Sequence, residues 1–175
     1  MKALLAGLLP RLLPENLPFL LIAHEGKADL DKSIPRKLKA WQDPTARFVV
    51  LRDQDSADCI TLKARLRELC ASRPNVLIRI ACREIESWYL ADLSAVDRAF
   101  GTSTAVHQNK KKYREPDYLG TPSGELQKLA PAFGKVSGAR SLGPLLALDN
   151  QRSTSFYHFV SGVRRLVESD GQGSS

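Results

Sequence analysis

The fold is decided by residues 48–58, FVVLRDQDSAD, in which four apolar residues are followed by three aspartates within six positions. A short apolar run that contains β-branched and aromatic residues is typical of a strand buried on both faces. Asp53, Asp55 and Asp58 mark the point where that strand gives way to a loop. The stretch therefore predicts a strand over Phe48 to Leu51 with an acidic cluster just past its carboxyl end.

Similar apolar runs lie on either side of this stretch. Phe19 to Ala23 (FLLIA) and Val76 to Ala81 (VLIRIA) predict two more buried strands. Apolar residues at helical spacing predict helices between the strands, the last of them capped by Ser56 or Asp58. Helices of this length between strands favour parallel pairing and an α/β fold with a short sheet covered by helices. The helices predicted in this half cover residues 4–13, 33–41 and 60–69.

The second half of the chain is predicted to be mostly helical. Residues 101–124 have the composition of a long loop, and the tail from Ser169 has that of a disordered segment. We therefore expect one domain, with an α/β core over 1–100, a basic helical extension over 101–168 and a tail over 169–175. The helices predicted in the extension cover residues 125–131, 141–148 and 153–168.

Composition narrows the class of protein. The chain has 175 residues, of which 43% are hydrophobic and 26% charged, as in a folded globular protein. Its three cysteines are odd in number and lack the short paired spacing of a zinc site, which favours reduced thiols and a cytoplasmic protein. The apolar N-terminus is interrupted by Pro10, Arg11 and Pro14, well short of the roughly 20 residues of a membrane span. We expect no membrane association.

Positive charge is concentrated in the second half. Residues 107–167 contain ten lysines and arginines but four acids, which makes this stretch +6 of a total of +7. Such a surface attracts polyanions by counterion release, so nucleic acid is the expected partner. The alternative, a basic surface that is merely solvated, is equally compatible with the charge count.

Acidic residues follow all three predicted strands. Glu25 follows the strand at 19–23, Asp53 and Asp55 follow the strand at 48–51, and Glu84 and Glu86 follow the strand at 76–81. In parallel sheets the ligand crevice lies at the carboxyl ends of the strands, so these carboxylates are expected on one rim. Carboxylate oxygens suit Mg²⁺ or Mn²⁺, which can activate a water at a phosphodiester. The alternative is that the aspartates only turn the chain and cap the next helix.

The spacing of the two glutamates limits their use. On a helix, residues two apart point in different directions, so only one of Glu84 and Glu86 could face the rim unless the chain is still extended there. Trp88 and Tyr89, which follow, are predicted to be core residues where a helix packs on the sheet.

A basic, glycine-containing segment precedes the helix predicted at 141–148. Lys135, Ser137 and Arg140 could clamp a phosphate through cationic charge and backbone amides. The same residues could simply begin a helix, with Ser137 or Gly138 as its cap.

Taken together, these segments resemble an uncharacterised bacterial family of Toprim-like proteins, related to nucleases of the overcoming-lysogenization (OLD) kind and often encoded beside an AAA-type ATPase. The segments Arg52 to Asp58 and Arg83 to Asp92 carry the resemblance most strongly. The other similar segments are Gly26-Lys27, residues 35–38, Lys135 to Arg140 and Asn150 to Phe156.

The resemblance implies a magnesium-dependent nuclease or a nuclease-derived subunit of a phage-defence system, with an ATPase as its partner. It implies metal ligands at Asp53 and Asp55. On this basis we expect Glu84 as a further metal ligand and catalytic roles for Asp53, Asp55, Glu86 and Lys135. Phosphate-binding residues would be Lys135, Ser137, Arg140 and Arg152. The family's first strand, with its glutamate, is expected to be missing because the chain opens on the helix; Glu25 is the nearest substitute.

Two other functions remain open. A non-catalytic module could bind nucleic acid or the ATPase through the basic second half of the chain. An aspartate-based phosphatase could use Asp53 as its nucleophile, although that motif normally has Thr or Val where Ala57 stands.

Overall fold

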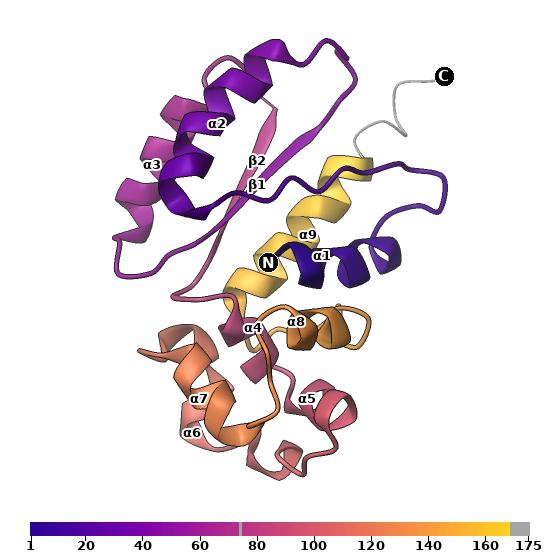
Figure 1. Cartoon of the computed structure of the whole chain (residues 1–175), viewed down its shortest axis with the longest axis vertical. Helices are drawn as coiled ribbons and strands as arrows, with labels where there is room; N and C mark the ends of the chain where they lie inside the picture. Colours follow the sequence, from indigo (N-terminus) through magenta and orange to yellow (C-terminus); the bar gives the residue numbers. More distant parts are fainter. Residues whose placement is uncertain (74, 169–175) are drawn as a thin grey trace.

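The computed structural model describes residues 1–73 and 75–168 and shows an elongated α/β protein (Figure 1). One pair of strands lies among helices in its upper part, and helices alone make up the lower part. The elements are α1 (Lys2–Leu8), η1 (Leu9–Arg11), α2 (Gly26–Ala40), β1 (Phe48–Asp53), α3 (Cys59–Leu69), β2 (Val76–Ala81), α4 (Glu86–Leu90), α5 (Leu93–Phe100), η2 (Ala105–His107), α6 (Lys111–Arg114), η3 (Pro116–Tyr118), α7 (Pro122–Leu129), α8 (Ser137–Leu142) and α9 (Thr154–Glu168).

The sheet of the described residues consists of two parallel strands, with β1 beside β2. The register pairs Phe48 with Val76 and Asp53 with Ala81, so both strands end at the same level. Helix α3 makes the crossover and is capped by Asp58, whose Oδ1 accepts hydrogen bonds from the N–H and the hydroxyl of Thr61, both at 2.8 Å. The predicted fold class, both of these strands and the Asp58 cap are confirmed.

The two faces of the sheet are covered by different helices. Val50, Ile78 and Ile80 pack with buried residues of α2 and α3, such as Leu66, in one apolar cluster. Leu51 and Leu77, which alternate with them, pack into a larger cluster with α1, α4 and α9. This alternation follows from the two-residue period of a strand.

The larger cluster connects the sheet to the helical part of the molecule. Trp88 and Tyr89 of α4 are each 1% exposed, which confirms their prediction as core residues. The Trp88 ring packs against Phe156 and Phe159 of α9, at centroid distances of 5.2 and 5.1 Å. Helix α9 lies against β2, so α4 sits where the sheet and the helices meet (Figure 1).

The predicted strand over Phe19 to Ala23 is wrong. These residues form an extended segment that makes no backbone hydrogen bonds to a neighbouring strand within the described part of the chain. Only Leu21 packs against the core, whereas Leu20 is 69% exposed. An apolar run becomes a buried strand only where a neighbouring strand and two covering layers are available.

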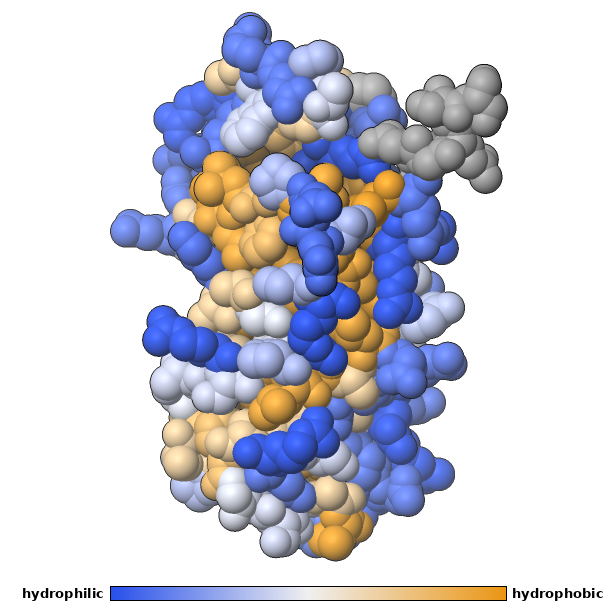
Figure 2. Space-filling view, turned by 90° about the vertical axis from the view of Figure 1, so that its right-hand side faces the viewer, coloured by the Kyte–Doolittle hydropathy of each residue, from blue (hydrophilic) through white to orange (hydrophobic). Residues whose placement is uncertain are grey.

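This segment lies on an unusually apolar face. Figure 2 shows the right-hand side of the molecule, where the chain between η1 and α2 runs, and hydrophobic side chains gather over its middle. Leu17, Phe19 and Ile22 are each more than 40% exposed.

Several predicted helices have different bounds. Helix α2 begins at Gly26 rather than near Ser33, with Pro35 inside it; the burial of Ile34 and Leu38 against the sheet outweighs the hydrogen bond lost at the proline. The helix predicted at 141–148 is α8, which begins at Ser137, so Ser137 starts a helix instead of forming a loop ahead of it.

The predicted loop at 101–124 contains η2, α6, η3 and the start of α7. The predicted disordered tail from Ser169 lies outside the described residues. No helix of the described residues is long and apolar enough to cross a membrane.

Candidate active site at the carboxyl ends of the strands

The loops that follow β1 and β2 are joined by hydrogen bonds. The N–H of Gln54 donates to the carbonyl of Ala81 at 2.9 Å, and the N–H of Asp55 donates to the carbonyl of Arg83 at 2.8 Å. Asp55 and Arg83 both have left-handed backbones, with φ of +54° and +59°. For residues other than glycine this conformation costs on the order of 1 kcal/mol each, and it concentrates at functional sites.

Asp53 ends β1 and points toward the start of α4. Its Oδ1 accepts a hydrogen bond from the N–H of Ile85 at 2.9 Å. Burial, together with the negative charges of Glu86 and Asp55, raises the pKa of Asp53 to about 6, while the bond from Ile85 opposes the shift. A carboxyl group held this way is costly to ionise.

Glu86, the first residue of α4, is the second acid of the site and is only 8% exposed. Burial raises its pKa, and the charge of Glu84 raises it further, whereas Lys135 lowers it. The amino group of Met1 also favours the ionised forms of both Asp53 and Glu86. Asp53 and Glu86 therefore form a pair of partly buried, mutually repelling carboxyl groups, which we call the carboxylate pair.

Tyr89 borders the carboxylate pair one helical turn after Glu86. Its hydroxyl is buried and has no hydrogen-bond partner within the described residues. Burial raises its pKa, and the charges of Glu86 and Asp53 add to the shift. A buried hydroxyl without a partner costs about 1–3 kcal/mol, so it is a group that a bound ligand or water would satisfy.

The remaining acids of the rim make polar contacts of their own. Oδ2 of Asp55 faces Nζ of Lys27 at 3.8 Å, and Asp58 is occupied in capping α3. Oε2 of Glu84 accepts a hydrogen bond from the N–H of Ser123, at the start of α7, at 2.7 Å. Residues 1–73 and 75–168 contain no group of three acidic, histidine or cysteine side chains already arranged around a metal position.

The predicted ligands Asp53, Asp55 and Glu84 all lie on this rim and act on its buried acids through their charges: Asp55 raises the pKa of Asp53, and Glu84 raises the pKa of Glu86. Metal binding at this rim stays a prediction. With two carboxylates, a Mg²⁺ ion would take most of its six ligands from water, as magnesium commonly does.

The predicted phosphate-binding residues are divided between two places. Lys135 is close enough to Glu86 to act on its pKa, and Ser137 and Arg140 lie exposed on α8. Arg152 instead lines a separate open hollow of about 680 Å³ at the start of α9.

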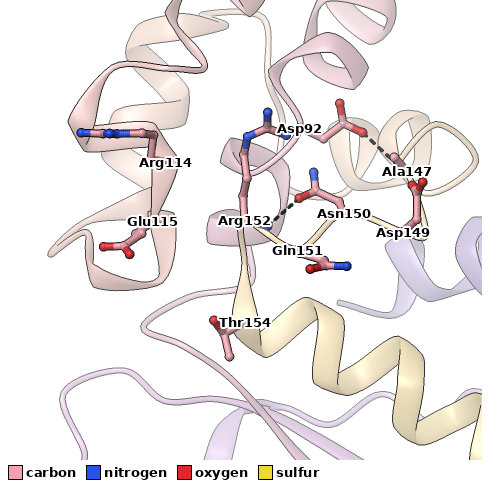
Figure 3. A pocket seen from close by; sticks show the side chains of 9 residues that line it. All are labelled: Asp92, Arg114, Glu115, Ala147, Asp149, Asn150, Gln151, Arg152 and Thr154. Atoms are coloured by element: carbon pink, nitrogen blue, oxygen red, sulfur yellow. Dashed lines mark hydrogen bonds between the residues drawn. The ribbon is translucent and has the colours of Figure 1, made fainter.

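Figure 3 shows that hollow, with Arg114 of α6 on one side and Arg152 pointing into its middle. Asp92 and Asp149 lie on the opposite side, so its charge is mixed. The Asp92 side chain is held in place, because its Oδ2 accepts a hydrogen bond from the N–H of Ala147 at 2.9 Å.

The site residue that sequence reasoning misses is Tyr89. Its prediction as a core residue is confirmed, but its hydroxyl also lies close enough to both carboxylates for their charges to raise its pKa. The sequence does contain a signal for this, because residues three apart share a helix face and Glu86 precedes Tyr89 by three.

These features define the class: an α/β protein with a partly buried carboxylate pair at the carboxyl ends of two parallel strands. A family described as a domain of unknown function (DUF4276) matches residues 1–164, and the chain belongs to this family. No curated protein and no solved structure matches the chain.

Proposed function

We propose that this protein is a Toprim-like, magnesium-dependent hydrolase of phosphodiesters, or a subunit derived from such a nuclease, with the carboxylate pair as its metal site. The observation that carries the proposal is geometric: the hydrogen bond from the N–H of Ile85 holds Asp53 next to Glu86, which is only 8% exposed, and burial raises the pKa of both acids. Two carboxyl groups that repel each other in a partly buried site are stabilised by a divalent cation between them.

The donor set fits a hard cation. Asp53 and Glu86 supply oxygen ligands, and the partnerless hydroxyl of Tyr89 borders them within the described part of the chain. When bound, Mg²⁺ or Mn²⁺ would neutralise charge on a phosphodiester and lower the pKa of a water ligand.

The other residues have roles that follow from their places. Lys135, whose charge already acts on Glu86, would stabilise the negative charge that develops on the phosphate. Asp55 and Glu84, whose charges act on Asp53 and Glu86, would orient water or substrate after release from Lys27 and Ser123. The resemblance adds nucleic acid as substrate and an AAA-type ATPase as partner, and the three cysteines favour the cytoplasm as location.

The test is cleavage of labelled DNA and RNA by the purified full chain with Mg²⁺ or Mn²⁺, compared with EDTA. Asp53→Asn and Glu86→Gln should each abolish metal-dependent cleavage. The control is Glu68→Gln, which removes an exposed carboxylate near the far end of α3 and should keep full activity. A wild-type protein that is inert on every nucleic acid and on a small phosphodiester such as bis(p-nitrophenyl) phosphate contradicts the proposal.

A second candidate is a non-catalytic module that binds nucleic acid or the ATPase. It is favoured because the described residues contain no three acidic, histidine or cysteine side chains already arranged around a metal position. Metal-independent binding that survives Asp53→Asn, without cleavage, would select it.

A further inference from the structure

A second basic feature lies away from the carboxylate pair, in the first half of the chain. A groove of about 360 Å³ runs between the second half of α3 and β2. Its charged lining residues are Lys63, Arg67, Arg73 and Arg79, and no acidic side chain lines it among the described residues. We call it the β2 groove.

Within residues 1–73 and 75–168, the four cations of the β2 groove have no carboxylate partner in direct contact. The described residues contain no ion pair between any of them and an acid. Arg73 does lower the pKa of Asp43 through its charge, but Asp43 lies outside the groove and makes no ion pair with Arg73 among the described residues. A surface with only one sign of charge concentrates counterions of the opposite sign.

Two of the four cations are held in place by neutral carbonyl groups. Arg73 donates from Nε to Leu38 at 3.3 Å and from Nη2 to Trp41 at 2.5 Å. Arg79 donates from Nε to the carbonyl of His158 at 2.8 Å. These bonds, and for Arg73 the Phe48 ring 5.6 Å from its guanidinium carbon, fix the two guanidinium groups without a counter-charge, whereas Lys63 and Arg67 belong to α3 and are partly exposed and exposed, respectively.

The position of Arg79 depends on a glycine in α9. A Cβ on Gly162 would overlap Nη2 of Arg79, so the guanidinium occupies the space that a side chain would take. Glycine inside a helix costs about 1 kcal/mol relative to alanine. Burial lowers the pKa of Arg79, and the nearby positive charge of Arg165 lowers it further.

We propose that the β2 groove binds the phosphodiester backbone of nucleic acid. Two fixed guanidinium groups and two flexible cationic side chains, beside the apolar residues of the groove, match a chain of phosphates. Contacts to phosphates do not read bases, so we expect binding that does not depend on the nucleotide sequence. β2 leads from the groove toward the rim, since Arg79 lies two residues before Ala81, the register partner of Asp53. The inference rests on the proposed function for its choice of ligand.

The test is binding of a fluorescein-labelled 20-nucleotide DNA or RNA by fluorescence anisotropy in EDTA, at several salt concentrations. The variant Lys63→Glu/Arg67→Glu should lower affinity at least about tenfold and reduce the slope of log K against log salt by roughly 2. The matched control is Lys37→Glu/Lys39→Glu on α2, which changes net charge equally at exposed positions outside the groove and should alter affinity less than about twofold.

Gly162→Ala tests the groove without removing any of its four charged side chains, because it only displaces the guanidinium of Arg79. It should keep the circular dichroism spectrum and melting behaviour of the wild type, or improve them, because the end of a flexible side chain can move aside. Displacing Arg79 should still weaken binding by about threefold or more, on the scale of one lost phosphate contact.

Equal loss in both double variants would mean that net charge alone attracts the ligand and would overturn the proposal, as would a wild-type protein that binds no nucleic acid. Hydrolysis of bis(p-nitrophenyl) phosphate is measured in parallel. Hydrolysis without groove binding refutes only this inference, and groove binding without hydrolysis refutes only the proposed function.

Discussion

Asp53 Oδ1 accepts a hydrogen bond from the N–H of Ile85 at 2.9 Å, which ties the end of β1 to the residue immediately before Glu86. The bond joins two positions 32 residues apart and keeps the two acids of the carboxylate pair on one rim. Because both acids are partly buried, the pair weakens the fold whenever both groups are ionised.

The pH dependence of stability should show this cost. The pKa of Asp53 rises from 3.8 in the unfolded chain to about 6 in the fold, so the folded state binds more protons between these values. The contribution of Asp53 to stability is complete below about pH 4 and is lost as pH rises through 6. We expect Asp53→Asn, which keeps an acceptor for Ile85, to be about 2–3 kcal/mol more stable than the wild type at pH 7.5.

Urea unfolding of both proteins at several pH values measures this difference, which should shrink toward zero near pH 4. The comparison with Asp53→Asn cancels the opposite effect of Asp97, whose pKa hydrogen bonds lower to about 2. If the Asp53→Asn protein is equally or less stable than the wild type at pH 7.5, the idea of a costly, ionised Asp53 is contradicted.

Magnesium should raise the melting temperature of the wild type. A ligand that binds only the folded state stabilises it by about 2.7 kcal/mol at 100 times its Kd. The shift should be larger at pH 7.5 than at pH 5, because protonated carboxyl groups do not bind the ion. Differential scanning fluorimetry of the wild type, Asp53→Asn, Glu86→Gln and the control Glu68→Gln measures it; an undiminished shift in Asp53→Asn would place the ion elsewhere.

Removing the hydroxyl of Ser155 should destabilise the contact between α9 and the sheet. Its Oγ accepts hydrogen bonds from Trp88 Nε1 at 2.8 Å and from the N–H of Cys82 at 3.3 Å. Ser155→Ala leaves a buried indole N–H unsatisfied, which costs about 1–3 kcal/mol. Chemical denaturation should show that loss, whereas Ser94→Ala, at an exposed position of α5, should change stability by less than about 0.5 kcal/mol.

Helices α1 and α8 are in contact because two glycines permit it. A Cβ on Gly143 would lie 2.5 Å from the carbonyl oxygen of Leu4 and 3.1 Å from Cα of Gly7. Gly143→Ala must therefore separate the two backbones and should cost about 1–3 kcal/mol. The control is Gly124→Ala in α7, where the nearest atom to the new Cβ is Thr121 Oγ1 at 3.7 Å, so this variant should be as stable as the wild type or more stable. The melting temperatures of both variants, measured under the same conditions, test the difference.

The local sequence pattern was sufficient to predict two of the strands and one helix cap. The apolar runs at 48–51 and 76–81 became strands because a partner strand and helices cover them, and Asp58 became a cap because its side chain reaches its own helix. The run at 19–23 has the same apolar character but no strand beside it among the described residues, and composition cannot tell whether a partner will be present.

The sequence alone determined the α/β class, the acidic rim and the place of Asp53 on it, since periodicity and strand polarity are local properties. Only the tertiary structure decided that Glu86 is buried close enough to act on Asp53, and that the buried hydroxyl of Tyr89 lies within reach of both charges. Those outcomes depend on burial and on distances between residues far apart in the chain, and the physical effects involved, desolvation and charge repulsion, arise only when the chain is folded.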